Sequence, residues 1–388
     1  MPWERRTVEE SRIAFVREYL EGIEGMSALC RKYEISRPTG YKWVERYAQT
    51  GSVAEMSRAP KTHPQKTNPE IVAQILSLRR EHPGTGAKKL RHILLKRGLE
   101  VPCASTVNAI LKRNGCISLE ASQAAQRYRH FEASESNGIW QADFKGNFAM
   151  LDGNRCYPLN ILDDHSRFCL CSAAQDNERY EDTAANFTRT FREYGLPRAL
   201  LCDNGNPWGT SQSVGYTRFE VWLMDLDILP MHGRSLHPQT QGKQERFNGS
   251  LKREKLAFAG DIADLVHAQS LLDEYRRFYN NERPHEALDM AVPAERYSPS
   301  PRSFPEVVRD WSYDSCSVSM VKSSGYVSFS KQGCFLSEAF SGLMIAVIPS
   351  PDQPDCLDLL YRNFRVARFD LRERCVVSRR PRRISRIV

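Results

Sequence analysis

The middle of the chain alternates between apolar, strand-like runs and amphipathic helical runs, and this order constrains the fold most strongly. Residues 139–148, 155–162 and 168–174 are predicted to form three successive strands, antiparallel because their links are short. A helix over 180–194 follows, and the apolar run 199–202 is typical of a buried parallel strand. A helix, a short strand and two further helices are then expected at 216–226, 228–231, 244–258 and 264–280.

This order, β-β-β-α-β-α-β-α-α, is that of an RNase H-like fold, so a central α/β RNase H-like core is expected over 138–298. The whole chain is predicted to be multidomain, with all-α helix-turn-helix modules at the N-terminus and a small β-barrel at the C-terminus. The expected domain boundaries around the core are 1–58 and 68–116 for the two helix-turn-helix domains, 117–137 for a helical connector, 311–377 for the barrel and 378–388 for a basic tail. A linker is expected at 59–67.

The first helical module has the composition of a DNA-binding unit. Its first helix is expected to bury Ile13, Val16 and Leu20, and Ser36 is a plausible cap for the third helix. That third helix is expected to bury Tyr41, Val44 and Ala48, and its free side carries the basic residues Arg37, Lys42 and Arg46. We interpret these three as DNA contacts; the alternative is a plain three-helix bundle with a solvated charged face.

The second module repeats the theme. Its last helix is expected to be capped by Ser105, to bury Val107, Ile110 and Leu111, and to end in the basic pair Lys112 and Arg113. These two residues are further candidate DNA contacts.

Charge is distributed unevenly along the chain, which carries +8 in total. Residues 1–125 have a net charge of +8, residues 136–300 of −5 and residues 301–388 of +5. Basic ends favour a polyanionic partner such as DNA, whose counterions are released on binding. No apolar run approaches the ~18 residues of a transmembrane helix, and the charged N-terminus lacks a signal core. We therefore expect a cytoplasmic protein with no membrane partner, associated with the nucleoid when bound to DNA.

Three acids stand out in the central region. Asp143 lies within the first strand, opposite the face shared by Trp140, Ala142 and Phe144. Asp203 ends the buried run 200–202, a usual position for a site residue in α/β sheets. Glu245 lies near the start of a long helix, on the face opposite an apolar stripe of Phe247, Leu251 and Phe258.

Three carboxylates in one cleft repel one another unless cations neutralise them. Hard oxygen ligands suit Mg²⁺ or Mn²⁺. Two such ions ~3.5–4 Å apart support in-line phosphoryl transfer. The catalytic and metal-binding residues are therefore predicted to be Asp143, Asp203 and Glu245, with two ions per site. No CxxC pair is present, so no zinc site is expected.

Five motifs carry a resemblance to a known family. They are WQADFKG (140–146), DDHSR (163–167), CDNG (202–205), HPQTQGKQERFN (237–248) and YNNERPHEAL (279–288). Together they closely resemble the DDE integrase core of bacterial insertion-sequence transposases, in the retroviral integrase superfamily. The resemblance implies that the three acids are the metal-binding triad and that the activity is DNA strand cleavage and joining at element ends. The last two acids are 42 positions apart, somewhat more than is usual in that superfamily, and the extra length is expected at 206–215.

Neighbours of the triad are weaker candidates. Lys243 and Arg246 flank Glu245 and would contact phosphate near the scissile bond, with helix-surface salt bridges as the alternative. Asn204 would position water or a DNA end, and Lys252 shares the face of Glu245. For Asp163 and Asp164 we favour turn capping over metal binding, and we expect Arg283 and His285 to pin the last helix against the core.

These features predict a transposase that binds the terminal inverted repeats of its element and joins the cut ends to target DNA. Because both ends must be processed together, at least a homodimer on DNA is expected. Two other functions stay open: a DNA-binding protein that kept the fold and lost the reaction, and a nuclease that cuts without joining. The sequence does not reveal the repeat sequence, the target preference, the duplication length or the copy-versus-excision pathway.

Overall fold

A computed structural model describes most of the chain, and it divides into two compact units, Met1–Lys66 and Thr67–Val388. In the described part, none of the helices combines the length and apolarity needed to cross a bilayer, and all eleven cysteines are free thiols. The described residues are 7–55, 67–117, 132–205, 207–209, 215–233, 242–313, 316–329 and 332–384. The predicted linker at 59–67 and connector at 117–137 lie largely outside these ranges.

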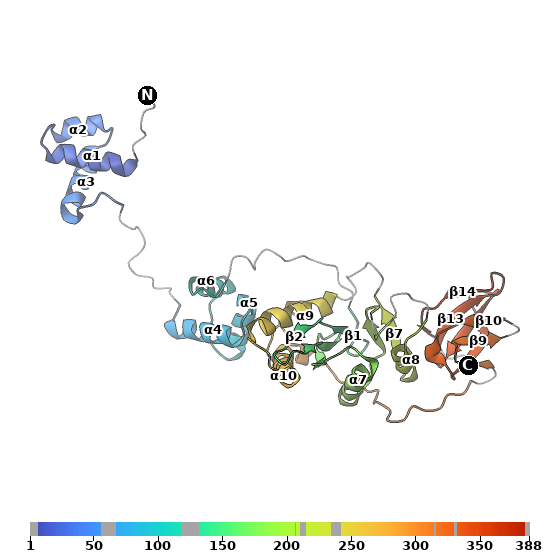
Figure 1. Cartoon of the computed structure of the whole chain (residues 1–388). Coiled ribbons are helices and arrows are strands. Elements are labelled where there is room, and N and C mark those ends of the chain that lie inside the picture. Colours follow the sequence, from blue (N-terminus) through green and yellow to red (C-terminus); the bar gives the residue numbers. More distant parts are fainter. Residues whose placement is uncertain are drawn as a thin grey trace. The chain divides into compact units, whose positions relative to one another are not determined.

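The first unit is a three-helix module of α1 (Val8–Leu20), α2 (Met26–Lys32) and α3 (Arg37–Thr50) (Figure 1). Thr7 and Glu10 form a capping box at α1, and the Ser36 hydroxyl accepts the Thr39 amide hydrogen at α3, as predicted. The C-terminal end of α3 is set by Gly51, at a φ of 67°.

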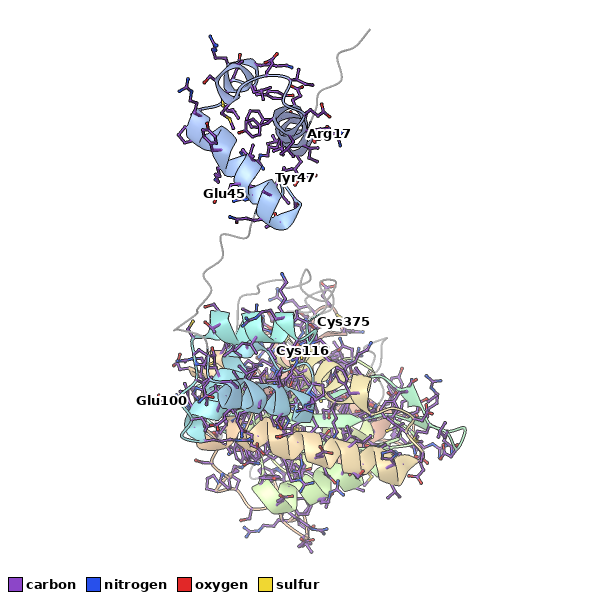
Figure 2. The ribbon with its side chains drawn as sticks, turned by 90° about the vertical axis from the view of Figure 1, so that its left-hand side faces the viewer. Arg17, Glu45, Tyr47, Glu100, Cys116 and Cys375 are labelled. Carbon is purple, nitrogen blue, oxygen red and sulfur yellow. The ribbon has the colours of Figure 1, made fainter. Side chains whose placement is uncertain are left out.

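The predicted inner faces of these helices were partly wrong. Phe15 and Val16 are buried in α1, whereas Ile13 and Leu20 are exposed. In α3 the buried residues are Gly40 and Trp43, while Tyr41 and Ala48 face solvent (Figure 2 labels Glu45 and Tyr47 on the same helix). The reason is the close approach of the helices: a Cβ at Gly40 would lie 2.8 Å from Cys30 Sγ and 2.9 Å from Phe15 Cζ.

The second unit begins with α4 (Pro69–Glu81), α5 (Ala87–Lys96) and α6 (Ala104–Arg113). The residue that precedes α6 as its N-cap is Cys103, not Ser105 as predicted. The expected inner residues Val107, Ile110 and Leu111 are buried, and so are Leu90, Ile93 and Leu94 on α5. They do not form a separate core, because the same cluster includes Phe247, Leu251, Leu272 and Tyr275 from the central region.

The central sheet has the strand order β5-β4-β1-β6-β7. Its strands are β1 (Ile139–Phe144), β4 (Leu159–Asp163), β5 (Cys169–Ala173), β6 (Ala199–Cys202) and β7 (Leu229–His232), and β2 (Phe148–Ala149) pairs β3 (Arg155–Cys156) in a separate small hairpin. The first three strands of the sheet pair antiparallel, whereas β6 and β7 run parallel to β1. The predicted strand directions are confirmed.

Four α-helices accompany this sheet: α7 (Tyr180–Tyr194), α8 (Arg218–Asp225), α9 (Gly242–Glu254) and α10 (Leu265–Asn281). Three short 3₁₀ helices follow α9 and α10 at Leu256–Phe258, Glu286–Leu288 and Pro293–Glu295. Trp140, Phe187, Phe191 and Phe219 fill the core between the sheet and the helices α7 and α8. The helix α9 ends four residues earlier than predicted, and Phe258, expected in its apolar stripe, is 60% exposed.

The C-terminal strands are β8 (Ser317–Met320), β9 (Tyr326–Phe329), β10 (Gln332–Phe335), β11 (Met344–Pro349), β12 (Cys356–Tyr361), β13 (Phe364–Asp370), β14 (Cys375–Ser378) and β15 (Arg382–Arg383), with a 3₁₀ turn at Glu338–Phe340. The prediction of a small barrel at 311–377 was wrong. Across the residues described there, β8, β11, β12, β13, β14 and β15 form one open sheet, and β9 pairs with β10 in another. The apolar interior of these sheets is covered by Tyr216, Val221 and Met224, at and beside α8, so closure is not needed to bury it.

Candidate active site

Asp143 lies in the middle of the sheet, on β1, and its side chain is held by a chain of polar groups. The side-chain amide of Asn248 on α9 donates to Asp143 Oδ2 at 2.9 Å. Asn160, the cross-strand partner of Asp143 on β4, donates to Asn248 Oδ1 at 2.9 Å. Ser172 on β5 donates in turn to Asn160 Oδ1 at 2.7 Å. Three strands and α9 thus fix the orientation of one carboxylate.

Asp203 follows the last residue of β6, next to β1 in the sheet. The Gly205 amide donates to Asp203 Oδ1 at 2.9 Å. A Cβ at Gly205 would lie 3.2 Å from that oxygen, so a glycine permits this close turn. Asn204 is exposed, and its side-chain amide donates to the Gly233 carbonyl at 3.3 Å. The loop at 206–215, where extra length was expected, lies largely outside the described residues.

Behind Asp203 lies a pair of residues that the sequence analysis missed. His232 Nδ1 lies 2.8 Å from the Asp203 carbonyl oxygen, and Nε2 lies 2.9 Å from Glu220 Oε1. Burial opposes protonation of His232, but the hydrogen bond and charge of Glu220 outweigh it and raise the His232 pKa. Glu220 is 5% exposed. No local sequence signal marks either residue, because they meet only when α8 packs beside β7.

Glu245 is in the first turn of α9 and is exposed. Phe247 and Leu251, on the other side of the helix, are 1% and 0% exposed and pack against α4–α6 and α10. The helical periodicity therefore places Glu245 away from the core, as the sequence indicates.

The electrostatics of Asp143 connect the three acids. Burial first, and then the charges of Asp203 and Glu245, together raise the pKa of Asp143 to about 7, against the lowering effect of the Asn248 hydrogen bond. Asp203 and Glu245 are thus near enough to Asp143 to disfavour its ionisation. Glu178, before α7, is a fourth acid beside Asp203, and burial followed by the charge of Asp203 raises its pKa.

The donor chemistry fits a hard divalent cation, since three carboxylates supply only oxygen ligands. In the described ranges, no group of three or more His, Cys, Asp or Glu side chains is gathered tightly enough to hold a metal ion. The fit therefore rests on the donor set and on the high pKa of Asp143, which a bound cation would offset.

The two acids of the DDHSR motif make buried contacts that stabilise the fold. Asp163 accepts hydrogen bonds from the amide and hydroxyl of Ser166, at 2.8 and 2.6 Å, so turn capping is confirmed for Asp163 but not for Asp164. Asp164, 1% exposed, pairs with Lys243 at 2.5 Å. Lys243 is only 8% exposed, and its ammonium group forms a buried ion pair with Asp164. Its predicted contact with phosphate was therefore wrong.

The other candidate DNA contacts lie at the surface or near it. Arg46 is partly buried, with its guanidinium 4.6 Å from the centre of the Trp43 ring and donating to the Ala54 carbonyl. The exposed candidates are Arg37 and Lys42 on α3, Lys112 and Arg113 at the end of α6, and Arg246 and Lys252 on α9.

Comparisons with known proteins bear on the identity of this site. The family described as Integrase core domain matches residues 133–238 and again 226–293. An uncharacterized 31.7 kDa protein of the insertion element IS407, from Burkholderia multivorans, is 24% identical over 243 residues, covering 60% of this chain and 82% of its own length. An uncharacterized 39.2 kDa protein of the insertion element IS476, from Xanthomonas euvesicatoria, is 28% identical over 176 residues, covering 44% of this chain and 47% of its own length. Residues 133–293 thus match the integrase core family, and together these findings support an insertion-sequence transposase of the integrase superfamily.

The chain also matches a Helix-turn-helix domain family at residues 11–54 and a Homeodomain-like domain family at residues 39–111. These two matches support DNA binding by the N-terminal region. Among solved structures, the HTLV-2 integrase catalytic core domain in complex with magnesium is 17% identical, with a TM-score of 0.34, covering 43% of this chain and 100% of that chain. At this TM-score the likeness adds nothing to the assignment.

Proposed function

We propose that the transposase binds the terminal inverted repeats of its element, cleaves a DNA strand there and transfers the new end into target DNA. Asp143, Asp203 and Glu245 are the catalytic residues in this proposal. The observation that carries it is the environment of Asp143, whose ionisation is opposed by burial and by the charges of the other two acids. In this proposal, three carboxylates from three separate segments share one site, at a cost that a bound cation would remove.

The three acids would hold two Mg²⁺ or Mn²⁺ ions. When bound, such a pair supplies charge stabilisation for both the attacking and the leaving oxygen of an in-line phosphoryl transfer. The protein's own contribution is orientation. Asn248 fixes the Asp143 carboxylate, and the Gly205 amide fixes that of Asp203. Asn204, exposed beside Asp203, would contact the nucleophile or the DNA end.

DNA would be held by surfaces outside the triad. Arg37 and Lys42 on α3 would read the repeat, with phosphate contacts from Lys112, Arg113, Arg246 and Lys252. We propose helix-turn-helix domains at 1–58 and 68–116, a catalytic domain at 138–298 and a C-terminal β domain at 311–377. Because two ends must be joined, the working species would be at least a dimer on DNA.

The test is a strand-transfer assay on the DNA that flanks the element's own gene. A pre-cleaved end is incubated with a plasmid target, with magnesium or with chelator. Joined product that requires both the cation and Asp143 supports the proposal. Asp143→Asn is expected to abolish joining while end binding persists. Joining by Asp143→Asn would refute the triad, and cut but never joined product from the wild type would indicate a nuclease.

End binding with neither cutting nor joining by the wild-type protein would indicate a DNA-binding protein without catalysis. The three carboxylates argue against this outcome. The incubation with chelator separates a catalyst from a purely DNA-binding protein. The purely DNA-binding protein binds end DNA and forms no product, with or without the cation.

A further inference from the structure

The histidine behind Asp203 is held from both sides. Its Nδ1 faces a main-chain carbonyl, which can only accept a hydrogen bond, and its Nε2 faces a carboxylate oxygen of Glu220. The ring lies on β7 at the register position of Cys202, the residue before Asp203. His232 is therefore placed to donate to the main chain of Asp203 itself.

Glu220 is fixed as firmly as the ring that it faces. Its other carboxylate oxygen, Oε2, accepts the Thr217 amide hydrogen at 2.7 Å and lies 3.2 Å from the Thr217 hydroxyl oxygen. These contacts are the capping box that begins α8. Because both carboxylate oxygens are engaged, Glu220 holds the imidazole plane in one orientation, as an outer partner does for a metal-binding histidine.

Gly209, in the segment after Asp203, lies against the same ring. The Gly209 amide donates to the Gly205 carbonyl at 2.9 Å, and a Cβ at Gly209 would lie 3.2 Å from His232 Cε1. With the Gly205 amide on the Asp203 carboxylate, these contacts tie Gly205 and Gly209, which follow the catalytic acid, to Asp203 and to the ring of His232.

α8 also joins the site to the C-terminal sheet. Phe219 and Leu223 pack into the central core, whereas Val221 and Met224 pack into the C-terminal cluster. The last residue of α8, Asp225, accepts a 2.5 Å hydrogen bond from the Tyr361 hydroxyl. Glu220 thus lies on a helix that packs against both the central core and the C-terminal sheet.

We propose that His232 and Glu220 are positioning residues that fix the main chain of Asp203, so that its carboxylate is presented to the cations together with Asp143 and Glu245. This inference rests on the proposed function, since it assigns a role relative to the triad. His232 itself touches neither substrate nor cation in this proposal.

The two ring nitrogens can be tested separately. His232→Asn retains an amide near the position of Nδ1 and therefore the bond to Asp203. His232→Gln retains one near Nε2 and therefore the bond to Glu220. His232→Phe keeps the ring volume and loses both bonds. His267→Phe, a histidine on α10 away from the triad, is the matched control.

Two measurements apply to the full-length protein. Hydrogen exchange of the Gly205 and Gly209 amides, measured without metal, reports how firmly the hydrogen bonds of these two amides are held. Mn²⁺ titration followed by electron paramagnetic resonance reports cation affinity. His232→Gln and His232→Phe are expected to accelerate exchange at both glycines and to weaken Mn²⁺ binding about 10-fold or more, the usual range for an outer-shell partner. His232→Asn and His267→Phe are expected to stay within about threefold of wild type.

Equal effects of His232→Asn and His232→Gln would overturn the inference, because a residue needed only for packing does not distinguish the two nitrogens. Wild-type exchange and Mn²⁺ affinity in a folded His232→Phe protein would overturn it too. Should His232→Phe fail to fold, Glu220→Gln is measured in its place and is expected to accelerate exchange at both glycines. The proposed function fails separately, if Asp143→Asn leaves Mn²⁺ binding and strand transfer unchanged.

Discussion

The buried ion pair between Arg283 and Glu254 gives a sharp prediction about stability. Arg283 Nε donates to Glu254 Oε2 and its terminal nitrogen to Oε1, both at 2.7 Å, and the same terminal nitrogen donates to Ser250 Oγ at 3.1 Å. The two charged side chains are 5% and 6% exposed. The pair ties the end of α9 to the segment after α10, as expected from the sequence for Arg283.

Replacing Arg283 by Met removes the cation and leaves the carboxylate of Glu254 buried without its partner. Water cannot replace the lost bonds at such low exposure, so the free energy of unfolding is expected to fall by about 3–5 kcal/mol. The double variant Arg283→Met with Glu254→Met leaves neither charge of this pair behind. It is expected to be more stable than the single variant, since apolar replacement of a buried pair is often close to neutral.

The assay is urea denaturation followed by tryptophan fluorescence. Trp140 and Trp208 report the second unit, and Trp43 lies in the first. The transition of the first unit serves as an internal control and is expected to stay unchanged. A loss below about 1 kcal/mol in Arg283→Met, or a double variant less stable than the single one, would refute the reasoning.

Three further predictions concern other parts of the molecule. Asn248→Ala removes the hydrogen bond that orients Asp143. It is expected to slow strand transfer about 10–100-fold and to leave the affinity for end DNA unchanged. An equal loss of affinity for end DNA would contradict this prediction. In an open helix, Gly40→Ala would raise the free energy of unfolding by ~1 kcal/mol. Here the added Cβ would lie less than 3 Å from neighbouring atoms, so the free energy of unfolding of the first unit alone is expected to fall by ~1–3 kcal/mol, as measured by the same denaturation. Burial, followed by the charge of Arg283, lowers the pKa of His285 to about 2. Below about pH 6.5 the unfolded chain binds a proton at His285 that the folded chain does not. The free energy of unfolding is therefore expected to be highest above this pH and to fall by up to about 1.4 kcal/mol per pH unit below it. His285→Phe is expected to flatten this slope, and an unchanged slope would exclude His285 as its source.

Local patterns predicted the elements of the central sheet well. Asp203 follows an apolar run, and Glu245 lies opposite Phe247 on its helix, so period and burial alone placed both. Lys243 shows the limit of sequence proximity. It is two residues from Glu245, and two residues of a helix point about 200° apart, so the lysine faces Asp164 in the interior.

The features that were missed depend on how elements meet. The five short strands expected near the C-terminus do not reveal whether their sheet closes or is covered by a helix, and here residues at α8 cover it. The contact between Glu220 and His232 joins a helix to a strand. The α4–α6 helices were expected to form a module of their own, but Leu251 and Tyr275 share their core. None of these partners lies within one helical turn or one hairpin of the other.

The central claim is that Asp143, Asp203 and Glu245 bind paired divalent ions. A crystal of the transposase with Mn²⁺ and its pre-cleaved end DNA, measured at the manganese edge, tests it most directly. The expected result is two anomalous peaks ~3.5–4 Å apart, with carboxylate oxygens of all three acids as ligands. Peaks that leave Glu245 unliganded, or no peak between β1, β6 and α9, would contradict the claim.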